Sequence, residues 1–169
     1  MRVLHAGEKI NRTQNENIVA LLGPVPRSEE TSHYYWNQQA LDLLEASGFE
    51  GLVLVPVRRG CTFYNMNDVQ DEDYMTREMQ WNGEMFQSVI DAGVKGAFAF
   101  WIPRNKHMQA RYTEQEFYDL VPKYPENVVM GIPKNAENVE PLIQYCVQSK
   151  IDIHDNLKCF AQAVVQKFS

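Results

Sequence analysis

Short continuous apolar runs alternate along this chain with longer segments in which apolar residues recur at helical spacing. A continuous apolar run is typical of a strand buried on both faces, and helical recurrence is typical of an amphipathic helix that covers a sheet. Strands are expected at 18–22, 51–57, 97–102, 127–130 and 150–153, with residues 2–6 as a further short edge strand. Helices are expected from Tyr35 to a stop at Gly48 and over 75–92, 113–122, 139–149 and 155–168.

This alternation of strands and helices predicts the fold class. Strands that follow one another through helices form a parallel sheet with helices on both faces. The pattern therefore predicts a single α/β domain over residues 1–169, with a doubly wound, mainly parallel five-stranded sheet of flavodoxin-like or Rossmann-like type.

Composition and charge narrow the classes of partner. The net charge of −6 provides no global basic field, so no polymeric nucleic acid partner is expected. No apolar run is long enough to span a bilayer, which excludes a membrane partner at this stage. The N-terminus has no apolar signal region, and the three cysteines have neither zinc-type spacing nor a disulfide pattern. The sequence thus favours a cytoplasmic location, with no metal and no organic cofactor.

Candidate ligand-binding segments follow from the fold class. In doubly wound sheets, ligands bind outside the carboxyl ends of the strands. That rule selects the segments GPVPR at 23–27, PVRRG at 56–60, the loop after residue 102, and GIPKNAE at 131–137. Neither a dinucleotide-binding glycine motif nor a P-loop is present, so those two chemistries have no support.

The stretch from Ala97 to Phe117 concentrates the candidate chemistry. A buried strand ends at Pro103, a loop rich in basic and amide side chains follows, and Thr113 is expected to open a helix with Glu116 in its first turn. A carboxylate there is favoured in its ionised form by the helix macrodipole, and Arg104 or Arg111 is expected to reinforce that state. A purely structural interpretation stays open, in which Thr113 and Glu116 form a capping box.

Three motifs give the chain a resemblance to a known family. They are LLGPVPR at 21–27 with the helix and strand that follow it, Trp81 together with FWIPR at 100–104, and TEQEF at 113–117. On these motifs, which together cover roughly residues 18 to 168 in matching order, the chain resembles the nucleoside 2-deoxyribosyltransferase-like family.

The resemblance implies an enzyme that acts at the N-glycosidic bond of a 2-deoxyribonucleoside or its 5′-monophosphate. Glu116 would be the nucleophile, and the reaction would pass through a covalent glycosyl-enzyme intermediate. The resemblance also implies a homodimer or higher homo-oligomer. The chain departs from the family pattern at four places: Ala20 replaces a tyrosine, residues 109–111 contain no aspartate, Tyr118 replaces a glycine, and Asn82 replaces a glutamate. These differences keep an alternative open, a non-catalytic protein on the same fold that senses or sequesters a nucleotide.

Further site residues are expected around the nucleophile. The expected substrate-binding residues are Gly23, Pro24, Arg27, Trp36, Trp81, Trp101, Arg104 and Thr113. The two arginines would grip phosphate or carboxylate oxygens, and the three tryptophans would form a wall for the base or sugar. The alternatives are surface ion pairs for the arginines and core packing for the tryptophans. The acidic cluster at 68–73 is expected to be a solvated loop.

Overall fold

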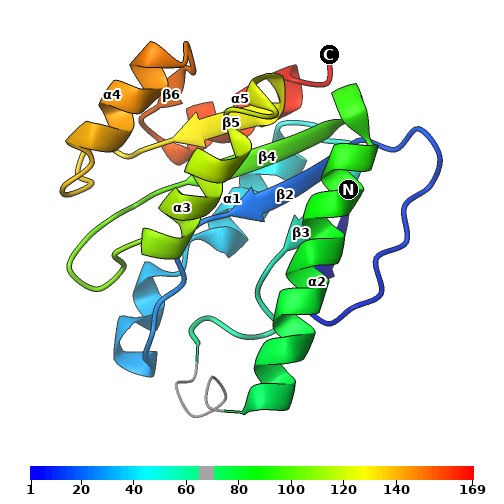
Figure 1. Ribbon diagram of the computed structural model, residues 1–169, viewed down its shortest axis with the longest axis horizontal. Helices are drawn as coiled ribbons and strands as arrows, with labels where there is room; N and C mark the ends of the chain where they lie inside the picture. The colour runs from blue at the N-terminus through cyan, green and yellow to red at the C-terminus, as the bar shows by residue number, and fades with distance from the viewer. Residues whose placement is uncertain (65–70) are drawn as a thin grey trace.

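The computed structural model describes residues 1–64 and 71–169, which form one parallel sheet covered by helices (Figure 1). The sheet has six strands in the order β1-β3-β2-β4-β5-β6, and every neighbouring pair is parallel. The strands are β1 (Arg2–His5), β2 (Ile18–Leu22), β3 (Leu52–Val55), β4 (Gly96–Trp101), β5 (Val128–Gly131) and β6 (Ile153–His154). The α-helices are α1 (Asn37–Ala46), α2 (Glu72–Asp91), α3 (Arg111–Leu120), α4 (Glu140–Gln148) and α5 (Leu157–Gln166).

The predicted fold class is confirmed, and the sixth strand, β1, is the short edge strand expected at residues 2–6 beside the five-stranded sheet. Without β1, the order β3-β2-β4-β5-β6 is the flavodoxin-like order 2-1-3-4-5. The additional strand β1 lies at the edge and pairs with β3 over its whole length. The central strands β2, β3 and β4 are buried at every residue, because helices cover both of their faces.

The two faces of the sheet carry separate apolar cores. Helices α2, α3 and α4 cover one face, where residues such as Met85, Phe117 and Leu142 pack on the sheet (Figure 1). Helices α1 and α5 cover the other face, with residues such as Leu44 and Phe160. This division follows from right-handed crossovers, because the chain moves one way from β2 to β3 and the opposite way from β3 to β4.

The reversal of direction creates a topological switch point between β2 and β4. At that point the backbone at Gly23 approaches the Trp36 indole and the Trp101 carbonyl so closely that a Cβ atom would overlap both. Only glycine fits there, and its presence brings the end of β2 against the end of β4. The loops after β2, β3 and β4 thereby meet at one edge of the sheet, where the fold favours a ligand site.

Helix α2 differs in detail from its predicted apolar stripe. Met85 and Val89 are fully buried as expected, but Met79 is 70% exposed and lies outside the core. The helix also begins earlier than predicted, because Asp71 caps it by accepting hydrogen bonds from the backbone N–H groups of Asp73 and Tyr74. Three members of the acidic cluster therefore lie at the start of α2: Asp71 caps the helix, and Glu72 and Asp73 are in its first turn. The fourth member, Asp68, lies outside the described residues. Across the described ranges, no helix combines the length and apolar character needed to cross a bilayer.

Candidate functional site

Glu116 lies in the second turn of α3, not in its first turn as predicted. The helix begins at Arg111, and the residue before it, Ala110, has a left-handed backbone with φ of 57°. Thr113 is therefore buried inside the helix and makes no cap hydrogen bond with its side chain. The alternative interpretation, a capping box between Thr113 and Glu116, is therefore wrong, and the structure leaves Glu116 without that structural role.

The side of α3 that carries Glu116 faces α2. On the opposite side, the Tyr118 hydroxyl donates to Glu114, and the Tyr118 ring packs edge-on against Tyr145 of α4. Glu116 follows Glu114 by two residues, which is roughly 200° around a helix. Because α3 lies between α4 and α2 (Figure 1), this rotation directs Glu116 toward α2.

The Glu116 carboxylate has an unusual electrostatic environment. No group within the described residues donates a hydrogen bond to it or forms an ion pair with it. Burial, and to a lesser extent the nearby Asp119, raise the pKa of Glu116 from 4.5 to about 7. The expectation that Arg104 or Arg111 holds Glu116 ionised is therefore wrong. A carboxyl group in this state exchanges its proton near neutral pH, which is unusual for a structural carboxylate.

Arg104 makes contacts that connect three parts of the chain. Its guanidinium forms an ion pair with Glu114 and donates to the Asn138 carbonyl at 2.7 Å. These contacts tie the loop after β4 to α3 and to the loop before α4. Arg104 thus fixes the helix that carries Glu116. Its buried Nε has no hydrogen-bond partner among the described residues, and its predicted role in binding an anion stays a prediction.

A second carboxylate lies on the facing helix. Glu78 of α2 is only 7% exposed and accepts a hydrogen bond at 3.0 Å from Nε of Arg58, which follows β3. The same guanidinium lies 4.2 Å from the centroid of the Tyr74 ring. This ion pair compensates the charge of Glu78, so the two carboxylates at this edge differ, and only Glu116 lacks a cationic partner among the residues described.

Tyr64 lies within electrostatic reach of both carboxylates. Burial raises the pKa of the Tyr64 phenol first, and Glu78, Tyr74 and Glu116 raise it further, while Arg27 lowers it. Tyr64 therefore lies within the electrostatic reach of both helices and of the loop after β2. The ring of Tyr64 packs against the core on the α1 side of the sheet, so this residue spans the carboxyl edge.

Sequence reasoning did not select Tyr64, Glu78 or Tyr74. Glu78 had a detectable signal, because it falls among Tyr74, Trp81 and Met85 at helical spacing on the buried stripe of α2. A carboxylate on an apolar stripe is rarely buried unless it is paired. Tyr64 had no such signal, since the loop after β3 shows no periodicity.

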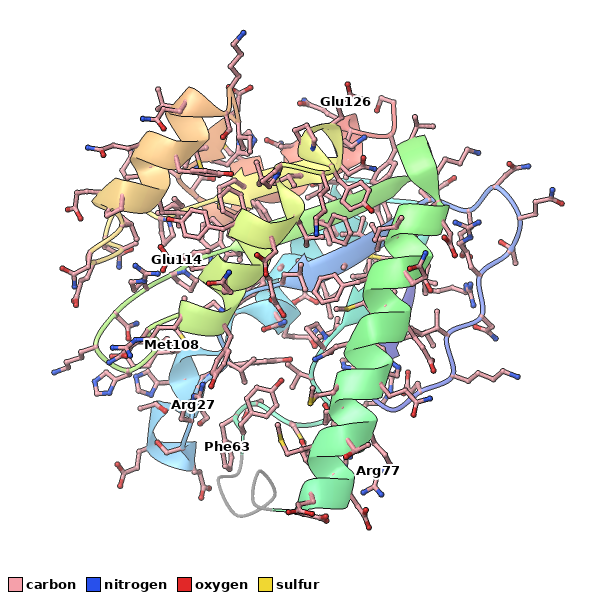
Figure 2. All side chains as sticks on the ribbon, in the orientation of Figure 1. Arg27, Phe63, Arg77, Met108, Glu114 and Glu126 are labelled. Carbon is pink, nitrogen blue, oxygen red and sulfur yellow. The ribbon has the colours of Figure 1, made fainter. Side chains whose placement is uncertain are left out.

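Arg27 is the predicted arginine that stays available. It is exposed at the end of the loop after β2, and its guanidinium lies 6.0 Å from the centroid of the Tyr112 ring. No carboxylate of the described residues forms an ion pair with it. Figure 2 shows Arg27 near the N-terminal end of α3, on the same side of the molecule as Phe63. Its predicted role in binding an anionic group stays a prediction.

The three tryptophans predicted to form a ligand wall all have packing roles. The Trp36 indole lies on Gly23 and donates to the Pro24 carbonyl at 3.0 Å. The Trp81 indole is buried and donates to the Glu8 carbonyl at 2.7 Å. The Trp101 ring packs against Phe160 and is also buried. The structure thus favours the core-packing alternative for these side chains, and it places Gly23 and Pro24 in the same packing arrangement.

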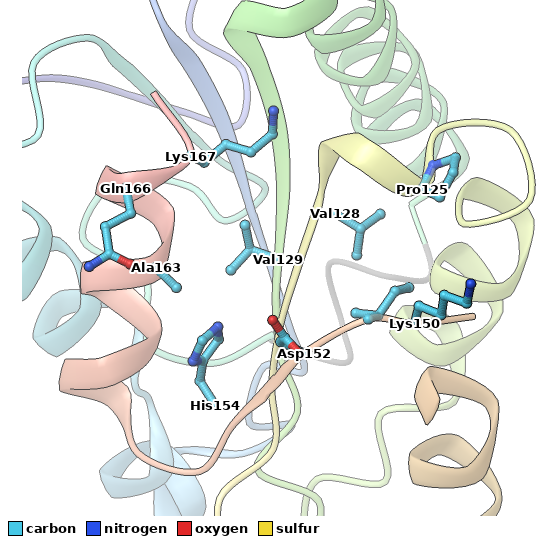
Figure 3. Close-up of a pocket in the computed structure, with 10 residues that line it drawn as sticks. Pro125, Val128, Val129, Lys150, Asp152, His154, Ala163, Gln166 and Lys167 are labelled. Carbon is cyan, nitrogen blue, oxygen red and sulfur yellow. The ribbon is translucent and has the colours of Figure 1, made fainter. Parts of the chain in front are cut away.

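A groove of about 390 Å³ lies elsewhere, beside β5, β6 and α5 (Figure 3). Its lining includes Lys150, Asp152, His154 and Lys167. It contains none of the residues around Glu116, and none of the predicted site residues. We therefore assign the candidate site to the carboxyl edge, where Glu116, Glu78 and Arg27 lie, and not to this groove.

The site carries no recognisable metal-binding set. Within the described ranges, no three histidine, cysteine, aspartate or glutamate side chains are arranged to hold a metal ion. A scan of the sequence against models of known protein families gave no match, and neither did a search of curated protein sequences. The geometry of the site and the sequence motifs are thus the basis for a functional proposal.

Proposed function

We propose that this protein cleaves the N-glycosidic bond of a 2-deoxyribonucleoside or its 5′-monophosphate, with Glu116 as the nucleophile. The observation that carries the proposal is the Glu116 carboxylate itself, which is partly buried at the carboxyl edge and has no cationic partner among the described residues. The resemblance of three sequence motifs to the nucleoside 2-deoxyribosyltransferase-like family supports the same residue as the nucleophile.

The proposed reaction has two displacement steps. A carboxylate oxygen of Glu116 attacks the anomeric carbon of the sugar, and the bond from that carbon to the base breaks with its electron pair on the base nitrogen, which takes up a proton. Water or a second base then attacks the same carbon, and the glycosyl–Glu116 ester bond breaks. Hydrolysis gives free base and free sugar, whereas a second base gives a new nucleoside.

The surrounding groups suit these steps. A carboxylate that is poorly solvated and lacks a cationic partner is a stronger nucleophile than one held in an ion pair. The Arg104–Glu114 ion pair fixes α3 and therefore the direction of Glu116. Arg27, exposed at the same edge, is suited to a 5′-phosphate.

The pH dependence of the reaction provides a specific prediction. Only the ionised form of Glu116 is a nucleophile, and its pKa of about 7 lies well above the ordinary value of 4.5. We therefore expect kcat/KM to rise about tenfold per pH unit below pH 7 and to level off above it. Initial rates between pH 5 and pH 9 check this; a rate that is already constant from pH 5 would show that Glu116 is ionised throughout.

The direct test is incubation of the protein with the four common deoxyribonucleosides and their monophosphates, followed by chromatography for free base. The proposal expects release of base from at least one of these compounds. If a compound raises the melting temperature but is recovered unchanged after prolonged incubation, the protein is the non-catalytic nucleotide-binding protein of the alternative interpretation.

A further inference from the structure

Tyr64 is fixed at the carboxyl edge by two backbone contacts from different loops. Its backbone N–H donates to the Pro26 carbonyl at 2.9 Å, in the loop after β2. Its phenolic hydroxyl donates to the Pro56 carbonyl at 2.8 Å, directly after β3. The side chain is thus held in place before any ligand arrives, which is the arrangement expected of a residue that positions a ligand.

These contacts determine what the phenolic oxygen can still do. A tyrosine hydroxyl has one hydrogen to donate and two lone pairs that accept. The hydrogen is used by Pro56, so the oxygen is left as an acceptor for a group that donates. Burial and the neighbouring carboxylates raise the pKa of Tyr64, so the phenol stays neutral across the physiological range and acts as neither base nor nucleophile.

The location of Tyr64 indicates which part of a substrate it would meet. In the proposed reaction the sugar must lie against Glu116 of α3. Tyr64 is hydrogen-bonded to Pro26, which precedes Arg27, and the Arg27 guanidinium lies 6.0 Å from the centroid of the Tyr112 ring in α3. Tyr64 is also hydrogen-bonded to Pro56, two residues before Arg58, which pairs with Glu78 of α2. These contacts place the phenol at the carboxyl edge between the two helices that carry the carboxylates. The donors that a deoxyribose offers are its hydroxyl groups. From this geometry we propose that Tyr64 is a substrate-positioning residue, whose phenolic oxygen accepts a hydrogen bond from a sugar hydroxyl of the deoxyribosyl unit bound at Glu116. The inference rests on the proposed function for the identity of the ligand.

The test pairs one substitution with substrate analogues. Tyr64→Phe keeps the packed ring and removes the oxygen. Binding is measured by calorimetry in a Glu116→Gln background, which prevents turnover, with the preferred deoxyribonucleoside and with its 3′-deoxy and 5′-deoxy analogues. We expect Tyr64→Phe to weaken binding of the parent compound about 5- to 10-fold, and to leave unchanged the binding of the one analogue that lacks the accepted hydroxyl.

This design separates positioning from structure. Loss of the Pro56 contact alone would weaken all three ligands equally, whereas loss of a sugar contact affects one analogue differently. Tyr124→Phe, at the opposite end of the strands, is the matched control and should change no affinity. If Tyr64→Phe alters the affinities for all three ligands by the same factor within about twofold, the inference is overturned. That result is distinguishable from failure of the proposed function, in which wild-type protein releases no base.

Discussion

Glu116→Gln is expected to lower base release by at least about 10³-fold while the protein stays folded. Glutamine has the shape of glutamate but cannot form the glycosyl ester, and Glu78, the other carboxylate described at this edge, is engaged with Arg58. Initial rates under saturating substrate, together with circular dichroism of the variant, check this prediction.

The matched control for this substitution is Glu126→Gln. Glu126 lies in the short 3₁₀ helix before β5, at the amino ends of the strands and far from α3's first turns (Figure 2). Its substitution removes one carboxylate of the same type and should leave the rate unchanged. Comparable rates for wild type and Glu116→Gln would show that the nucleophile is assigned to the wrong residue.

The same substitution is expected to stabilise the protein at high pH. The pKa of Glu116 is about 7 in the folded chain against an ordinary value of 4.5, so the folded state binds more protons between these values. Wild-type stability attributable to this group therefore falls as pH rises from about 4.5 to about 7 and stays low above that range. The full shift corresponds to about 3 kcal/mol, and partial exposure to solvent reduces our expectation to about 2 kcal/mol.

Urea unfolding of wild type and Glu116→Gln at pH 5 and pH 8 measures this effect. Other groups cancel in the difference between the two proteins, including Glu8, whose pKa Arg59 lowers to about 2 and whose contribution is lost only in acid. We expect the advantage of the variant to grow by about 2 kcal/mol between the two pH values. An advantage that shrinks with rising pH would mean that a cation holds Glu116 ionised in the folded state.

Much of the sheet could be predicted from the sequence, because its strands are continuous apolar runs with turn-forming residues at their ends. The start of α3 could not, because Ala110 has none of the side chains that usually cap a helix and instead adopts a left-handed backbone. The sequence favours Thr113 as the start of the helix, which would put Glu116 in the first turn. The helix begins at Arg111, so Glu116 lies in the second turn. The position of Glu116 in the chain was predicted, but its environment was not.

The other parts of the site depend on tertiary contacts that leave little trace in sequence. Trp36 and Trp101 are residue types that often line ligand sites. In the structure, however, Trp36 packs on Gly23 and Trp101 packs on Phe160, both in the core. Tyr64 belongs to a loop without periodicity. It is identified only by its hydrogen bonds to the Pro26 and Pro56 carbonyls, which come from two different loops. Glu78 was the exception, since its place on an apolar stripe was visible in the sequence.

The central claim is that Glu116 becomes covalently bonded to the sugar. Wild-type protein is mixed with the preferred deoxyribonucleoside, quenched in acid at short times, digested and examined by peptide mass spectrometry. We expect the peptide containing Glu116 to gain the mass of one deoxyribosyl unit, and this gain to be absent in Glu116→Gln. Rapid release of base with the deoxyribosyl mass on a different residue would contradict it.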